Sequence, residues 1–190
     1  MINTPFCDGL VETEGASARR SRLNELLSLG DLPMSPSPLE QHILHGLACT
    51  VGSALGSTPP SVEQCLLAFT ASNSAGLSVG ARAWSKHGHR SGEHPATAKM
   101  TKDSLSSGWW GRPKGPVETI NANALELFWR VINNVTWKNL HWLPHQVLVY
   151  EVRVQEGYGM RWSRSKEGPW LFRGFVEPMM VDGHERGWLH

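Results

Sequence analysis

The sequence predicts an α+β fold in which N-terminal helices are followed by a C-terminal antiparallel β-meander within a single domain. Two observations support this prediction. Apolar residues recur at helical spacing as far as about residue 133, and they alternate with polar residues after Pro144. The chain has 190 residues, of which 40% are hydrophobic and nine are tryptophan, which is enough for one buried core. We therefore expect the α+β domain to span residues 37–190.

Residues 1–36 differ in composition from the rest of the chain. They are rich in Ser, Gly and Pro, and they contain one short amphipathic patch around Leu23 and Leu26. A segment with so little apolar surface to bury favours a disordered N-terminal extension.

The first helix is expected to begin after Ser37. The stretch "SPLE" places Ser37 at the N-cap, Pro38 at the first helical position and Glu40 at the third, which is the pattern of a capping box. Apolar residues follow at helical spacing, and Gly56 is a suitable end. A second helix is expected in "STPPSVEQCLLAF", which again opens with prolines and continues with helical spacing.

Two further helices are separated by a long basic segment. The first of them is expected at residues 76–87, and the second, at residues 117–133, is apolar on more than one side and should be buried. Between them, residues of about 88–116 break every periodicity and form an expected loop. From Arg82 to Lys114 the chain carries seven Lys or Arg against two acidic residues, although its overall net charge is only +1.

The C-terminal part alternates as β-strands do. Leu148, Tyr150 and Val152 fall on one face of a strand, while Glu151 and Arg153 fall on the other. The stretches "GYGMRW" and "PWLFRGFVEP" are expected to form the next two strands of the meander.

Charged residues on these strands form the first candidate site, which consists of Glu151, Arg153, Arg161, Arg173 and Glu177. If the polar faces of the three strands coincide, three guanidiniums could hold an anionic ligand, because the arginine fork suits phosphate and carboxylate. The alternative is a network of ion pairs between strands, without a ligand. Parity alone does not fix the register between strands, so both interpretations stay open.

The helical side offers a second set of basic and aromatic residues. In "ARAWSKHGHRS", Arg82 and Lys86 are four residues apart, which places them on one side of a helix. Cations at a helix C-terminus are also favoured by the helix dipole without any function. The residues expected to approach a ligand from this side are His87, His89 and Arg90, with Trp109 or Trp110 stacking on a base.

The pair His141 and His145 resembles a helical metal motif in its spacing alone. Pro144 disfavours a helix there, and in an extended segment the two Cα atoms would be roughly 13 Å apart. We therefore assign no metal site, and the sequence indicates no particular cofactor.

The cysteines and the N-terminal residues provide information on the cellular compartment of the protein. Cys7, Cys49 and Cys65 form an odd set without C-x-x-C spacing, which indicates neither a disulfide framework nor a thiolate zinc site. Acidic residues precede the first basic one, and no run approaches the roughly 18 apolar residues that cross a bilayer. We expect an intracellular, cytoplasmic protein with no membrane association.

Three functions are consistent with these features. The first hypothesis is an intracellular binding module for an anionic ligand, such as a phosphate-bearing nucleotide or short RNA, on the arginine-bearing sheet face. The second is a hydrolase or lyase on the same surface, with Glu151 or His145 as general base and the arginines stabilising negative charge. The third is a structural or protein-interaction domain whose tryptophans belong to the core.

Overall fold

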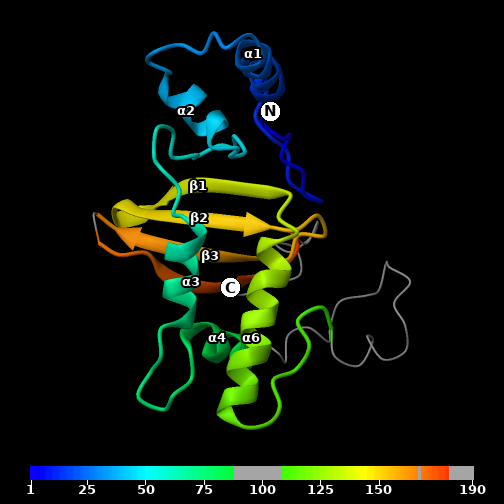
Figure 1. Cartoon of the computed structure of the whole chain (residues 1–190), viewed down its shortest axis with the longest axis vertical. Helices are drawn as coiled ribbons and strands as arrows, with labels where there is room; N and C mark the ends of the chain where they lie inside the picture. Colours follow the sequence, from blue (N-terminus) through cyan, green and yellow to red (C-terminus); the bar gives the residue numbers. More distant parts are fainter. Residues whose placement is uncertain (88–107, 167, 180–190) are drawn as a thin grey trace.

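The computed structural model describes residues 1–87, 108–166 and 168–179 (Figure 1). His89 and Arg90, with most of the expected basic loop, lie outside these ranges. The described residues form five α-helices followed by a four-stranded antiparallel sheet, which confirms the predicted α+β class. The helices are α1 (Ala16–Leu29), α2 (Pro38–Leu44), α3 (Val62–Thr70), α4 (Val79–His87) and α6 (Val117–Ile132). The strands are β1 (Trp137–Leu143), β2 (Val147–Arg153), β3 (Gly159–Ser165) and β4 (Leu171–Val176), with the 3₁₀ turn η2 (Pro144–Gln146) between β1 and β2.

The four strands follow one another in the order β1-β2-β3-β4. The sequence predicts three of them, but β1 begins at Trp137, before the residue where the alternation becomes evident. Glu151 lies opposite Arg161, and Tyr150 lies opposite Trp162. The register shifts between β3 and β4, because Arg161 pairs with Gly174 whereas Trp162 pairs with Phe172. Arg173 is the extra residue of this bulge, so it departs from regular alternation.

Helices α3, α4 and α6 lie against one face of the sheet, while α1 and α2 lie beyond its β1 edge (Figure 1). The β1 edge is occupied by the segment that follows α2. The amide of Ala48 donates to the carbonyl of Lys138 at 2.7 Å, and that of Ala54 donates to the carbonyl of Leu140 at 2.8 Å. These bonds satisfy backbone groups that an open edge strand would leave unpaired.

The N-terminal 36 residues, for which the composition favours disorder, contain α1 and a buried ion pair. The guanidinium of Arg20 is 2% exposed and donates to both carboxylate oxygens of Glu12, each at 2.7 Å. It also donates to the carbonyl of Leu47 at 3.3 Å. A single arginine thus ties α1 to the chain after α2, which composition does not reveal. Within the described residues, no helix is long and apolar enough to span a membrane.

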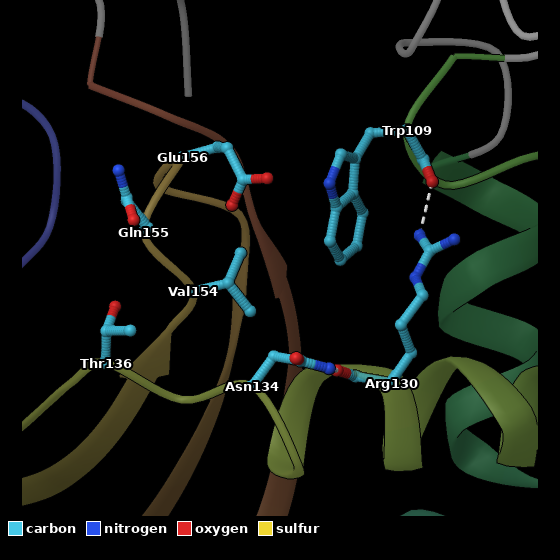
Figure 2. Close-up of a pocket in the computed structure, with 7 residues that line it drawn as sticks. All are labelled: Trp109, Arg130, Asn134, Thr136, Val154, Gln155 and Glu156. Atoms are coloured by element: carbon cyan, nitrogen blue, oxygen red, sulfur yellow. Dashed lines mark hydrogen bonds between the residues drawn. The ribbon is translucent and has the colours of Figure 1, made fainter.

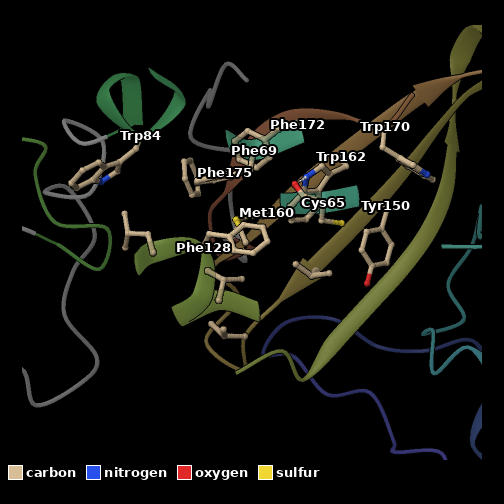
Figure 3. Close-up of a cluster of buried hydrophobic side chains, with 14 of the residues drawn as sticks. Cys65, Phe69, Trp84, Phe128, Tyr150, Met160, Trp162, Trp170, Phe172 and Phe175 are labelled. Carbon is tan, nitrogen blue, oxygen red and sulfur yellow. Dashed lines mark hydrogen bonds between the residues drawn. The ribbon is translucent and has the colours of Figure 1, made fainter. Parts of the chain in front are cut away.

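The main core lies between the sheet and helices α3, α4 and α6. Its aromatic rings surround Phe69 of α3 (Figure 3). The Phe69 ring lies 5.1 Å from that of Phe128 on α6 and 4.8 Å from that of Phe172 on β4, measured between centroids. Gly80 of α4 packs directly on Phe69, because a Cβ at residue 80 would lie 2.2 Å from the Phe69 Cζ atom. The absence of a side chain at Gly80 therefore allows α4 to approach α3 and the sheet.

Replacing Gly80 with alanine is expected to lower the free energy of unfolding by about 1–3 kcal/mol, because the added methyl overpacks the core. Urea denaturation followed by tryptophan fluorescence would measure the loss. The control is the same change in a Phe69→Leu background, where the smaller side chain leaves room for the methyl. An equal cost of Gly80→Ala in both backgrounds would show that the contact with Phe69 is not its cause.

Candidate functional site

A pocket of about 290 Å³ opens between α4 and β4. We call it the α4–β4 pocket. Its lining includes three cationic side chains, those of Arg82, Lys86 and Arg173, and all three residues are exposed. Other residues that line it are His87, Phe172 and Gly174. Cations gathered around a concave surface attract and orient an anionic group such as a phosphate.

Helix α4 presents its basic residues to the pocket because its other side is anchored in the core. Ser78 caps the helix, since its Oγ accepts from the amide of Ala81 at 3.0 Å. Trp84 is buried, and its indole Nε1 donates to the carbonyl of Trp110 at 2.9 Å. Arg82 and Lys86, four residues apart, lie on the side of the helix that lines the pocket.

Arg173 reaches the same pocket because of the bulge in β4. The neighbouring Phe172 belongs to the core on the helical side of the sheet. In a regular strand Arg173 would point to the opposite face, where Arg161 lies, but the register shift removes it from that alternation. The strand therefore adds a third cation to those of α4.

His87, the last residue of α4, lies beside the carboxylate of Glu177, which follows β4. Its Nδ1 is 3.7 Å from Oε1 of Glu177. The same Oε1 accepts a hydrogen bond from Nε1 of Trp110 at 2.8 Å, which holds the carboxylate in place. Among the described residues, neither Nδ1 of His87 nor Oε2 of Glu177 has a hydrogen-bond partner. An imidazole that lies near a carboxylate and next to cationic side chains can transfer a proton to or from a bound phosphate ester.

The other predicted strand residues form an ion-pair cluster on the opposite face of the sheet. Glu151 and Arg153 are each 3% exposed, and Nε of Arg153 donates to Oε1 of Glu151 at 2.5 Å. Nε of Arg161 donates to the other oxygen of Glu151. Burial raises the pKa of Glu151, but the two guanidiniums outweigh it and hold this pKa below its ordinary value. A buried carboxylate paired on both oxygens is poorly suited to act as a general base.

Arg153 also connects this cluster with the α4–β4 pocket. Its Nη1 donates to the carbonyl of Gly157 at 2.5 Å and to the backbone carbonyl of Glu177 at 2.8 Å. The guanidinium therefore holds the chain at the position from which the Glu177 side chain reaches His87. Glu151, Arg153 and Arg161 thus share one face, as the strand parity suggests. Arg173 instead lines the α4–β4 pocket, and the side chain of Glu177 lies beside His87.

His145, the alternative general base, lies apart from both groups. It is exposed in η2, with φ of 63°, and η2 joins β1 to β2. At about 3.3 Å per residue, His145 is roughly 20 Å along the chain from Glu151. Neither of these two residues lines the α4–β4 pocket.

The two loop tryptophans are packed against residues of the protein itself. Trp110 is 1% exposed, and its ring centroid lies 4.7 Å from that of Phe175. Trp109 is half-buried and stacks on Tyr158 at 4.6 Å, with an interplanar angle of 11°. The guanidinium carbon of Arg130 lies 3.9 Å from the centroid of the Trp109 ring. In this arrangement Trp110 positions Glu177, and its ring is not accessible for stacking on a base.

Other chemistries have less support in the described residues. Burial raises the pKa of the Cys7 thiol to about 11 and that of Cys65 to about 12, so both thiols are protonated and inert as nucleophiles. No group of three or more His, Cys, Asp and Glu side chains in the described ranges is arranged to hold a metal ion.

Sequence reasoning includes His87 and Arg173 in the site but misses the role of Glu177 as the partner of His87. The four-residue spacing of Arg82 and Lys86 correctly indicates that both lie on the same side of a helix. No local pattern joins His87 to Glu177, because these residues are 90 positions apart in sequence and meet only through the packing of α4 on β4.

Comparison with known protein families finds a match over the C-terminal part of the chain. The family model described as the CdiA C-terminal tRNase toxin domain matches residues 68–177, which is more than half of the chain. The matched region begins in α3 and ends at Glu177, so it contains the α4–β4 pocket and the whole sheet. Searches of curated proteins and of solved structures returned no match.

Proposed function

Because the chain belongs to the family of CdiA C-terminal tRNase toxin domains, we propose that it is a ribonuclease that cleaves tRNA. This proposal agrees with the expected nucleic-acid ligand and is more specific, because it names a substrate and a reaction. It also favours the enzyme alternative over a module that only binds. A tRNA substrate would place the activity in the cytoplasm of a cell.

The observation that carries the proposal is that the α4–β4 pocket combines three cations with His87, which has the carboxylate of Glu177 beside it. Arg82, Lys86 and Arg173 would bind the phosphate and stabilise the charge that develops on it during cleavage. His87, with the carboxylate of Glu177 3.7 Å from its Nδ1, would be the catalytic base. Both requirements of phosphodiester cleavage, charge stabilisation and proton transfer, are thereby met in one place.

RNA itself supplies the nucleophile for the proposed reaction, namely the ribose 2′-hydroxyl. The imidazole of His87 removes the proton from this hydroxyl, and the oxygen attacks the adjacent phosphorus. The new P–O2′ bond replaces the P–O5′ bond, and the departing 5′ oxygen takes up a proton from water. The products are a 2′,3′-cyclic phosphate and a 5′-hydroxyl, so the reaction needs RNA and does not occur on DNA.

Removal of one phosphate-binding cation is expected to weaken RNA binding and to reduce its salt dependence. In the full chain, Arg173→Ala and Lys86→Ala should each lower the slope of log K against log salt by about 1. Fluorescence anisotropy titrations between about 50 and 200 mM salt would measure this slope. The probe is a 2′-O-methylated copy of a tRNA, which cannot be cut through its 2′ oxygens.

The matched control is Arg22→Ala, which removes an exposed arginine from α1 that pairs with Glu25. This variant should keep the wild-type slope. Identical slopes for the wild type, Arg173→Ala and Lys86→Ala would exclude the α4–β4 pocket as the site of phosphate contact.

A further inference from the structure

A second pocket, of about 390 Å³, lies beside Trp109 at the end of α6 (Figure 2). We call it the Trp109 pocket. Trp109 and Arg130 lie on one side of it, and Gln155 and Glu156 lie on the other. Val154 and Asn134 also contribute to its lining. Its volume falls within the usual range of small-ligand sites, which is roughly 300–1,000 Å³.

The charges of the Trp109 pocket do not favour a phosphate. It has one guanidinium and one carboxylate, and the guanidinium of Arg130 lies over the Trp109 ring and donates from Nη2 to the carbonyl of Trp109. Glu156 would repel an anion. The pocket therefore differs in kind from the α4–β4 pocket, where three cations converge.

The remaining polar groups favour a neutral ring that carries hydrogen-bonding groups on its edge. Nδ2 of Asn134 donates to the carbonyl of Arg130 at 2.8 Å, which leaves its Oδ1 as an acceptor. Gln155 and Glu156 are exposed, so a ligand in the pocket can reach their side chains. Tyr158 and Arg130 cover the two faces of the Trp109 ring, so Trp109 contributes its ring edge, and Val154 adds an apolar side chain. A pocket that combines an aromatic edge and an apolar side chain with several hydrogen-bond acceptors suits a nucleobase.

The two pockets are connected through adjacent tryptophans. The rings of Trp109 and Trp110 are in contact, with centroids 4.5 Å apart. Trp110 in turn holds Glu177, which lies beside His87. The packed side chains of Trp110 and Glu177 therefore lie between His87 and the Trp109 pocket.

We propose that the Trp109 pocket binds the base of a nucleotide close to the cleaved bond and prefers a base with an exocyclic amino group. The carboxylate of Glu156 can only accept hydrogen bonds. The exocyclic amino group of cytosine, adenine or guanine offers it two N–H donors, whereas uracil offers only its ring N3–H. This inference rests on the proposed ribonuclease function, because it concerns the same RNA chain.

The first test maps cleavage of a single-stranded RNA library by the full-length wild type and by Glu156→Gln. The wild type should enrich bases that carry an amino group at one position near the cut. Glu156→Gln should remove this preference and lower kcat/KM roughly tenfold on the preferred sequences. The control is Glu126→Gln, which changes an exposed glutamate on α6 outside both pockets and should behave like the wild type.

The second test does not depend on cleavage. Nuclear magnetic resonance should show that CMP or GMP shifts the indole N–H signal of Trp109 more than UMP does, and that Glu156→Gln abolishes the difference. If the wild type cleaves RNA while Glu156→Gln changes neither the cleavage preference nor these shifts, the base site is refuted and the ribonuclease function stands. If the wild type leaves RNA intact but the nucleotide shifts behave as described, the ribonuclease proposal fails and the base site is supported.

Discussion

Replacing His87 with alanine is expected to lower kcat for tRNA cleavage by roughly 100- to 10,000-fold, the usual contribution of a general base. Affinity for the 2′-O-methylated RNA should change little, because the cations Arg82, Lys86 and Arg173 remain in the α4–β4 pocket. A gel-based cleavage assay and an anisotropy titration would measure the two quantities separately. The separation matters, because a residue that only binds RNA would change affinity instead of kcat.

The control for this variant is His45→Ala, which removes an exposed histidine at the end of α2. It should cleave tRNA at the wild-type rate. A His87→Ala variant that remains folded by circular dichroism and cleaves as fast as the wild type would remove His87 from the mechanism. Glu177→Gln keeps the acceptor for Trp110 but loses the charge beside His87, so it should lower kcat by a smaller factor.

The second large effect is expected in stability. Glu151→Gln should lower the free energy of unfolding by about 3–5 kcal/mol, because it leaves the buried guanidinium of Arg153 without its counter-charge. Urea denaturation at neutral pH would measure the change. The same substitution at Glu25, whose pair with Arg22 is exposed, should cost at most about 1 kcal/mol. Equal effects at the two positions would contradict the structural role of the buried cluster.

At acidic pH, Glu151 should no longer stabilise the wild type relative to Glu151→Gln. Because its pKa in the folded protein is lower than its ordinary value of 4.5, the contribution of Glu151 is fully present above pH 4.5. As the pH falls further, the folded protein must also protonate this carboxylate, and the contribution is lost. The stability difference between wild type and Glu151→Gln should therefore narrow below pH 4.5, and a constant difference would count against the ion pairs as its source.

The sequence predicted the starts of helices and the alternation in β2, because both depend on residues that are close together in the chain. The capping box of Ser37 and Glu40 is present at the start of α2, as expected, but the helix ends at Leu44 and not near Gly56, because the chain from Ala48 onwards bonds to β1. A second capping box, between Ser61 and Gln64, opens α3. The alternation in β2 correctly separates the core residues Tyr150 and Val152 from Glu151 on the opposite face.

Features that depend on contacts between residues far apart in the chain could not be predicted from the sequence. The bulge that turns Arg173 towards α4 follows from the pairing of β3 with β4, and parity along one strand gives no sign of it. The buried pair of Arg20 and Glu12 stabilises α1 by long-range contacts, although the composition of that segment favours disorder. The site was therefore predicted as one face with five charges, whereas the structure divides these charges between the two faces of the sheet.

The most direct test of the central claim is the incubation of purified tRNA with the purified full-length chain, followed by analysis of the products. We expect discrete fragments whose upstream pieces end in a 2′,3′-cyclic phosphate, and we expect the 2′-O-methylated copy of the same tRNA to stay intact. If the chain is folded by circular dichroism and the unmodified tRNA also stays intact, the chain is not a tRNA-cleaving ribonuclease.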